Sequence, residues 1–303
     1  MKGFLNFQWL ILPLLLLLAW PACARTQTIL IVKSSDNRFF NRSIETLTHG
    51  SRQQIEYRIS TLKQLKKQPS LLKEIDVMVT LGMRAALYAN EAMAYTPVIH
   101  SYITAQQFNT LKHQKQHHAI LLNQPFSRYL RFIKVLLNAQ SVGILHSRSQ
   151  AIERTILQRM EQAFAIRIQQ KLLSEDDNPI SAARDLLQTS DVLLALPDPA
   201  IYNRRSLKGI LLTSYRQQKP LISYSPAQVK SGALAAIYST PENIGRQLAE
   251  RLRSLLSTPS QPTAPFQYAK YFDIKINRRI AESLELNIAS KESLLNQLQA
   301  QQD

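Results

Sequence analysis

The chain has 303 residues, of which 45% are hydrophobic and 19% are charged, and its formal net charge is +16. These values exclude a disordered chain, and the length is enough for one large or two moderate domains. The positive charge favours anionic partners such as a membrane surface or an acidic ligand. The basic residues are scattered and accompany no zinc-finger or RNA-binding motif, so we do not expect nucleic-acid binding.

The first residues indicate export. Lys2 is followed by the apolar run 9–19 and then by Ala22-Cys23-Ala24, which is the order of a secretory signal peptide. A retained membrane anchor is the alternative, but the run is shorter than the ~20 residues that a span needs. A lipoprotein anchored at Cys23 is a second alternative. We expect residues 1–24 to be removed and residues 25–303, which contain no cysteine, to work in the periplasm.

Strand and helix patterns alternate up to residue 138. Short apolar and β-branched runs predict strands at 28–32, 55–60, 76–80, 97–102 and 119–122. Apolar residues at helical spacing lie between several of them, and Thr104 and Gln107 have the spacing of a capping box. A helix is predicted over 126–138.

The same alternation restarts after residue 138. Strands are predicted at 141–146, 167–172, 192–196, 221–224 and 272–276, and helices at 149–165, 178–187, 242–256, 278–284 and 291–299. Residues 257–265 form a polar, proline-rich linker. We expect an α/β fold of two Rossmann-like lobes with parallel sheets joined by a hinge. The first lobe would comprise residues 25–137 with a returning segment near 240–258, and the second residues 138–239 completed by 266–303.

Two predicted strands of the second half end in helix-start signals. The strand at 192–196 runs into Asp198-Pro199, and the strand at 221–224 runs into Ser225-Pro226. An Asp or Ser cap followed by proline is favourable at the start of a helix. Ligands of open parallel sheets bind where strands end and helices begin. The turns at Asp198 and Ser225 are therefore candidate ligand-facing loops.

Several segments resemble a known family. The stretches LLALPDPAIYN, GILLTSYRQQKPLISYSPAQVKSGALAAIYSTPENIGRQLAE and KYFDIKINRRIAESLEL resemble the type I periplasmic substrate-binding proteins of ABC importers, in particular the branch with tryptophan- and tyrosine-type binders. AILLNQPFSRYLRFIKVLLNAQSVGILHS is similar to the segment that links the lobes in that branch. The resemblance covers most of 28–286, and it is specific in the second half and loose before Asp76.

The resemblance implies a hinged protein that closes on a small molecule held by the loops after its strands. Carried over by position, the ligand-binding residues would be Ser34, Ser35, Gly82, Met83, Arg84, Ser101, Tyr102, His146, Ser147, Asp198, Tyr202, Tyr224 and Ser225. This chain has Pro197-Asp198-Pro199 where the amino-acid binders commonly have Asp-Asn. Asp198 is therefore either a receptor for a ligand ammonium group or only a cap.

The residue chemistry leaves alternatives at each position. Arg84 suits a carboxylate, and the helix starts at Gly82 and Ser225 suit an anion, but Arg84 is equally compatible with a solvent-facing helix position. Ser34 and Ser35 are either ligand donors or turn residues. The candidate tyrosines either stack on a flat ligand or pack between helix and sheet; they are Tyr102, Tyr202 and Tyr224.

Enzyme and metal chemistry find little support. The sequence contains no G-x-S-x-G, P-loop or G-x-G-x-x-G motif, so we expect no catalytic residues and no cofactor. His113, His117 and His118 have i, i+4 spacing on a helix, but the surrounding KHQKQHH is basic and favours a solvated helix end over a metal site.

Three functions remain. The first is a monomeric, periplasmic solute-binding protein of an ABC importer, which delivers a small ligand, such as an aromatic amino acid or a similar carboxylate-bearing heterocycle, to a permease. The second is an orphan ligand-binding accessory or sensor that works with an outer-membrane receptor or a signalling partner. The third is a structural adaptor for cell-wall or membrane partners, which only the basic charge supports.

Overall fold

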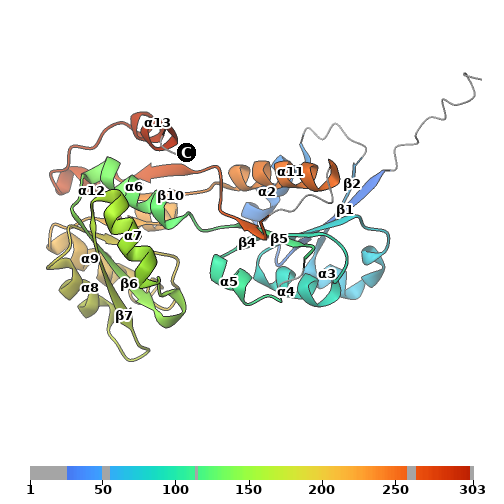
Figure 1. Cartoon of the computed structure of the whole chain (residues 1–303), viewed down its shortest axis with the longest axis horizontal. Helices are drawn as coiled ribbons and strands as arrows, with labels where there is room; N and C mark the ends of the chain where they lie inside the picture. Colours follow the sequence, from blue (N-terminus) through green and yellow to red (C-terminus); the bar gives the residue numbers. More distant parts are fainter. Residues whose placement is uncertain (1–25, 50–54, 113–114, 258–263, 301–303) are drawn as a thin grey trace, which may run out of the picture.

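The computed structural model describes residues 26–49, 55–112, 115–257 and 264–300, so the predicted signal peptide lies outside the described residues. The described chain forms two lobes side by side along the long axis of the molecule (Figure 1). Each lobe is built on a six-stranded sheet. The predicted α/β fold of two lobes with mainly parallel sheets is confirmed. Within the described ranges, no helix has the length and apolarity needed to cross a membrane.

The sheet of the first lobe is parallel throughout, in the order β11-β5-β4-β3-β1-β2. Central strands such as ILIV in β1 are apolar on both faces because helices cover both sides of the sheet. The strands are β1 (Gln27–Lys33), β2 (Ile55–Thr61), β3 (Val77–Leu81), β4 (Val98–Ile103), β5 (His117–Leu121) and β11 (Phe266–Gln267).

Helices α2 and α11 cover one face of this sheet, and α3, α4 and α5 cover the other (Figure 1). A Cβ on Gly245 of α11 would lie only 2.4 Å from the Ser43 carbonyl oxygen of α2, so glycine permits the close packing of these two helices. The helices are α2 (Arg38–Thr48), α3 (Leu62–Lys67), the 3-10 turn η1 (Pro69–Leu72), α4 (Met83–Ala92), α5 (Ala105–Asn109) and α11 (Pro241–Ser257).

The sheet of the second lobe has the order β12-β10-β9-β8-β6-β7, and β12 runs antiparallel to β10. Its strands are β6 (Ser141–Ser147), β7 (Arg167–Leu173), β8 (Val192–Leu194), β9 (Leu221–Ser223), β10 (Ala235–Tyr238) and β12 (Asp273–Ile276). Its helices are α6 (Phe126–Leu137), the 3-10 turn η2 (Arg148–Gln150), α7 (Arg154–Phe164), α8 (Pro179–Leu187), α9 (Leu207–Arg216), α10 (Pro226–Lys230), α12 (Arg278–Ser283) and α13 (Lys291–Ala300).

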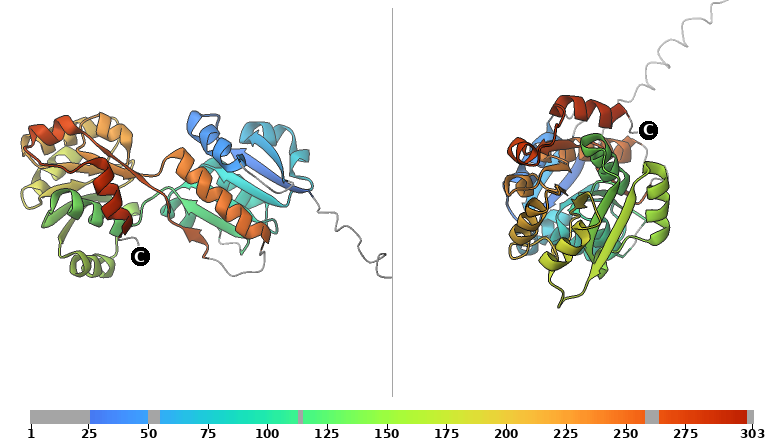
Figure 2. Two further views of the ribbon diagram at one scale, coloured as in Figure 1. Left: turned by 90° about the horizontal axis from the view of Figure 1, so that it is seen from above. Right: turned by 90° about the vertical axis from the view of Figure 1, so that its left-hand side faces the viewer.

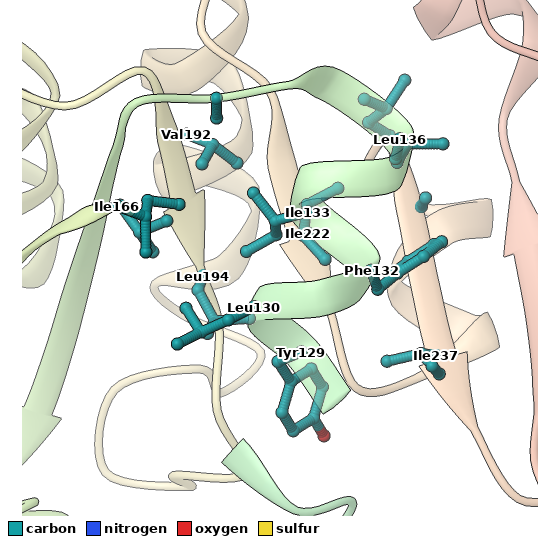
Figure 3. Close-up of a cluster of buried hydrophobic side chains, with 14 of the residues drawn as sticks. Tyr129, Leu130, Phe132, Ile133, Leu136, Ile166, Val192, Leu194, Ile222 and Ile237 are labelled. Carbon is teal, nitrogen blue, oxygen red and sulfur yellow. The ribbon is translucent and has the colours of Figure 1, made fainter. Parts of the chain in front are cut away.

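Helix α6 belongs to the core of the second lobe. Its buried side chains, including Tyr129 and Phe132, pack with Val192, Ile222 and Ile237 of the second sheet (Figure 3). The lobe boundary expected at residue 137 would assign this helix to the first lobe. That assignment is wrong, because the apolar face of α6 is buried against the other sheet, and the chain leaves the first lobe directly after β5.

The chain crosses between the lobes three times, as the view from above in Figure 2 shows. The crossings follow β5, β10 and β11, because α11 and β11 return to the first lobe and β12 lies in the second. Hydrogen bonds join the crossings: Gln124 Nε2 donates to Ser239 Oγ (2.9 Å), and Ser239 Oγ donates to the carbonyl oxygen of Tyr271 (2.5 Å). Because each crossing is bonded to another, the lobes are expected to move about one shared hinge.

Some local predictions are confirmed and others are wrong. The capping box of Thr104 and Gln107 is present at the start of α5. The residues after Asp198 form turns, and the next helix begins at Leu207, so Asp198 does not start a helix. His117 and His118 lie in strand β5, where His117 is buried, so the predicted solvated helix end is wrong there. His113 lies outside the described residues.

Candidate functional site

The first-lobe residues Ser34, Gly82 and Arg84 lie together at the ends of β1 and β3, and hydrogen bonds join Ser34 to Arg84 and to Ala85 of α4. Ser34 Oγ accepts from the Ala85 N–H of α4 (3.0 Å), and Arg84 Nη2 donates to the Ser34 carbonyl oxygen (2.8 Å). Gly82 has φ of +90°, and a Cβ there would lie 2.8 Å from Ser34 Oγ. Glycine is therefore required by both its backbone and its neighbour. The serine acts as a cap for α4, supplied from another strand.

The remaining first-lobe candidates point in different directions. Ser35 is exposed, whereas Ser101 is fully buried and its Oγ donates to the Ile120 carbonyl oxygen (3.3 Å). Met83 is partly buried against the core between α5 and β5. Tyr102 has φ of +56°, and its ring packs edge-on against Phe40. Of these four, only Tyr102 lines a pocket between the lobes.

In the second lobe, the buried carboxylate of Asp198 caps no helix and instead bonds to two backbone N–H groups. One carboxylate oxygen accepts from the Ser147 N–H (2.7 Å) and the other from the Ala200 N–H (3.1 Å), and the side chain is almost fully buried. His146 is also buried, with Nδ1 beside the Ser147 carbonyl oxygen (3.1 Å), and Tyr202 packs into the core beneath α8 and α9. The carboxylate of Asp198 thus holds the loop after β8 against the end of β6.

A pocket of about 470 Å³ lies between the lobes beside the hinge, and we call it the hinge pocket. Both lobes and the second crossing contribute to its wall. Its volume is within the range of small-molecule sites. Its lining residues are Phe39, Tyr102, Thr104, Leu122, Asn123, Pro197, Tyr224, Ser225, Pro226, Ala227, Tyr238, Ser239, Thr240, Pro241 and Glu242.

Aromatic rings dominate the hinge pocket. Burial raises the pKa of Tyr102 to about 12, and burial together with the Asp273 carboxylate raises the pKa of Tyr238 to about 12, so both phenols are neutral at neutral pH. The Tyr102 hydroxyl lies 2.6 Å from Ser43 Oγ. Burial also raises the pKa of Tyr224. The pocket therefore offers ring faces and edges with few charged groups.

The sequence located part of the hinge pocket. Of the predicted site residues, Tyr102, Tyr224 and Ser225 line it, and the other ten lie elsewhere. Sequence reasoning missed Phe39, Leu122 and Tyr238, among others. Leu122 ends a predicted strand and Asn123 follows it, so the rule that ligands bind at strand ends was enough to find them. Tyr238 ends β10, a strand that was not predicted.

A second cavity of about 940 Å³ lies in the second lobe, at the ends of β6 and β7 and away from the hinge. Its wall comes from that lobe alone and includes Ser147 from β6, Leu172 from β7 and Asn178 before α8, together with Arg205 and Glu175. It is a wide surface hollow with charges of both signs.

A buried histidine pair lies within the first sheet. His100 Nε2 and His117 Nδ1 are 3.2 Å apart, Thr80 Oγ1 lies 2.8 Å from His100 Nδ1, and His117 Nε2 lies 2.7 Å from the Met93 carbonyl oxygen. Burial lowers the pKa of His100 to about 3, with further lowering from His117 and His118. Within the described residues, no group of three or more possible protein ligands for a metal ion occurs.

Comparison with known proteins identifies the family. The family model described as ABC transporter substrate binding protein matches residues 48–301. The chain belongs to this family, as its three-crossing, two-lobed fold and inter-lobe pocket also indicate. A search of the curated proteins finds no match.

Solved structures share the fold at low sequence identity. A substrate-binding protein with adhesive properties from Clostridium difficile, in a ligand-free, open structure, has a TM-score of 0.66 at 15% identity, with 88% of this chain and 97% of that chain covered. A conserved domain protein from Vibrio cholerae has a TM-score of 0.58 at 19% identity, with 90% and 98% covered. An ABC domain from Streptococcus pneumonia in complex with L-Trp has a TM-score of 0.57 at 17% identity, with 90% and 98% covered.

Proposed function

We propose that this protein is the periplasmic solute-binding component of an ABC importer, which binds a small, flat organic molecule in the hinge pocket and delivers it to a permease. The hinge pocket carries the proposal. Its wall comes from the first lobe, the second lobe and the crossing between them, so one ligand there contacts all three. A ligand that contacts both lobes favours the closed arrangement over the open one.

The chemistry of the pocket supports a flat ligand. Phe39, Tyr102, Tyr224 and Tyr238 supply four aromatic side chains within about 470 Å³, and aromatic rings bind flat molecules by stacking or edge-to-face contact. The Streptococcus protein with the same fold was solved with L-Trp, whose indole ring is flat and aromatic.

The family of the protein and the first residues of its sequence support the proposal that it is exported and takes part in transport. Substrate-binding proteins of ABC transporters pass their ligand to a membrane permease, and the sequence 1–24 has the order of a cleavable signal peptide. We propose that the exported chain works as a monomer, with lobe closure as the signal that the permease reads.

Thermal unfolding of purified residues 25–303 against a panel of aromatic and heterocyclic molecules tests the proposal. A ligand at ~100 times its dissociation constant stabilises the folded protein by about 2.7 kcal/mol, which raises the Tm by several degrees for a chain of this size. We expect the rise to disappear in Tyr224→Ala and to persist in Tyr215→Ala, which removes a half-exposed tyrosine of α9 outside the pocket. A flat response of the folded wild-type protein across the whole panel would contradict the proposed function.

A further inference from the structure

Helices α10 and α11 both begin at the wall of the hinge pocket, but neither helix start is available to bind an anionic ligand group. At α10, Pro226 has no N–H, Ala227 N–H donates to Ser225 Oγ (3.2 Å), and Gln228 N–H donates to the Ser225 carbonyl oxygen (3.1 Å). The first donors of this helix are therefore already used by the chain itself. A free helix N-terminus attracts carboxylates through such donors, and this one offers none.

The start of α11 is occupied in the same way. Pro241 lacks an N–H, and Asn243 N–H donates to Thr240 Oγ1 (3.2 Å). The Glu242 carboxylate lies in the first turn, where Arg42 Nε donates to it at 2.7 Å, and hydrogen bonds to Arg42 and to its own backbone N–H hold its pKa below the usual range. This side chain already fills the position that an anionic ligand group would take at the helix end.

The rest of the wall adds no cation. Among the described residues that line the hinge pocket, none is a lysine or an arginine. Arg84, on which the sequence-based expectation of a carboxylate depended, lies outside the pocket and donates to the Ser34 carbonyl oxygen. An anionic group brought into the pocket would lose water without gaining a cationic partner among the lining residues, and it would lie near the Glu242 carboxylate.

The lining residue Asn123 keeps a donor for a ligand acceptor. The Asn123 Oδ1 atom accepts from the Ala105 N–H (3.0 Å), which leaves its NH₂ group to donate. We propose that the hinge pocket selects an uncharged, flat aromatic molecule with a hydrogen-bond acceptor and discriminates against anionic molecules with the same ring. This inference rests on the proposed function and narrows its ligand class, in place of the carboxylate-bearing ligand expected from the sequence.

Matched pairs of ligands test this inference. Calorimetric titration with indole-3-acetamide against indole-3-acetate, and with nicotinamide against nicotinate, compares the same ring and side-chain length with and without a negative charge. We expect the uncharged member of a binding pair to bind at least about tenfold more tightly, because a carboxylate buried without a cationic partner regains less than it loses in hydration. The ratio of affinities is insensitive to a general loss of stability in a variant.

A charge added to the wall supplies a second readout. Leu122→Lys places a cation at a lining position where the leucine is 40% exposed, and Leu212→Lys places one on α9 where the leucine is 44% exposed. We expect the first variant to reduce the preference for the uncharged member severalfold and the second to leave it unchanged.

The outcomes separate the two proposals. Equal affinity for both members, or tighter binding of the anionic member that is lost in Tyr224→Ala, would overturn the inference and leave the proposed function standing. Absence of binding by either member of both pairs, when the wider panel also gives no response, would overturn the proposed function itself.

Discussion

The two ends of the inter-lobe region use polar residues differently. At the ends of β1, β3 and β8, the side chains of Ser34, Arg84 and Asp198 bond to the chain's own backbone, at Ala85, Ser34 and Ser147 respectively. At the hinge end, aromatic rings face a pocket, and the Asn123 amide retains its donor. Ser34, Arg84 and Asp198 therefore build the loops, and the hinge end offers the surface that a ligand can contact.

This difference shows that position at a strand end is not sufficient to make a binding residue. Serine, aspartate and glycine at these turns are required by the backbone whether or not a ligand binds. A binding residue also needs an atom or a ring face that the protein has not already used. The following predictions test this distinction, beginning with the largest expected effect.

Asp198→Ala is expected to lower the free energy of unfolding by about 2 to 4 kcal/mol, because the Ser147 and Ala200 N–H groups lose their acceptor in a buried site. Urea unfolding measures the loss. Asp185→Ala, an exposed partner of Lys171, is the control and is expected to change the value by no more than ~1 kcal/mol. A normal stability with abolished ligand binding would place Asp198 in the binding site and contradict its role in holding the loop after β8 against the end of β6.

Tyr224→Ala is expected to weaken ligand binding tenfold to a hundredfold, since loss of a ring contact costs about 1.5 to 3 kcal/mol. Titration calorimetry with the best ligand of the panel gives the dissociation constants of Tyr224→Ala and of the control Tyr215→Ala. Unchanged affinity in Tyr224→Ala would show that the ligand binds outside the hinge pocket.

Acid is expected to destabilise the first lobe through His100. Its pKa is about 3 in the folded protein and near 6.5 when exposed, so the unfolded chain binds more protons below pH 6.5. This contribution to stability is full above pH 6.5 and is lost as the pH falls toward 3, by up to ~1.4 kcal/mol per pH unit. Urea unfolding at several pH values should show a shallower loss in His100→Gln than in wild type or in His49→Gln, which changes an exposed histidine.

Arg84→Ala is expected to have the smallest effect. The side chain is exposed and donates one hydrogen bond to a carbonyl oxygen, so the free energy of unfolding should change by less than ~1 kcal/mol and the dissociation constant by less than about twofold. Calorimetry and urea unfolding of the same sample measure both. A tenfold loss of affinity would show that the ligand binds beside Arg84, at the ends of β1 and β3, and not in the hinge pocket.

The sequence predicted the alternating architecture well because each central strand is a short apolar run between helical patterns. It missed β10, whose residues AAIY are half alanine and have little β-branching. It also placed α6 in the wrong lobe, since the apolar face of a helix does not reveal which sheet covers it. Both errors affect the hinge, where segments distant in sequence meet.

The site was harder to predict than the fold for a related reason. Strand order tells which loops gather at one edge, but it does not tell whether Ser34 caps another helix or whether Asp198 is bonded on both oxygens. Phe39 lies in the first turn of α2, and its contribution to the pocket depends on how the two lobes lie about the hinge. Only the three-dimensional arrangement separates groups already bonded from groups still available.

The most direct test of the account is a crystal structure of residues 25–303 with the ligand that gives the largest rise in Tm. The account predicts the ligand ring in contact with Tyr102, Tyr224 and Tyr238, and the Ser34–Arg84 and Asp198–Ser147 hydrogen bonds unchanged. A ligand bound instead to Arg84 or Asp198, with those bonds broken and the hinge pocket empty, would contradict it.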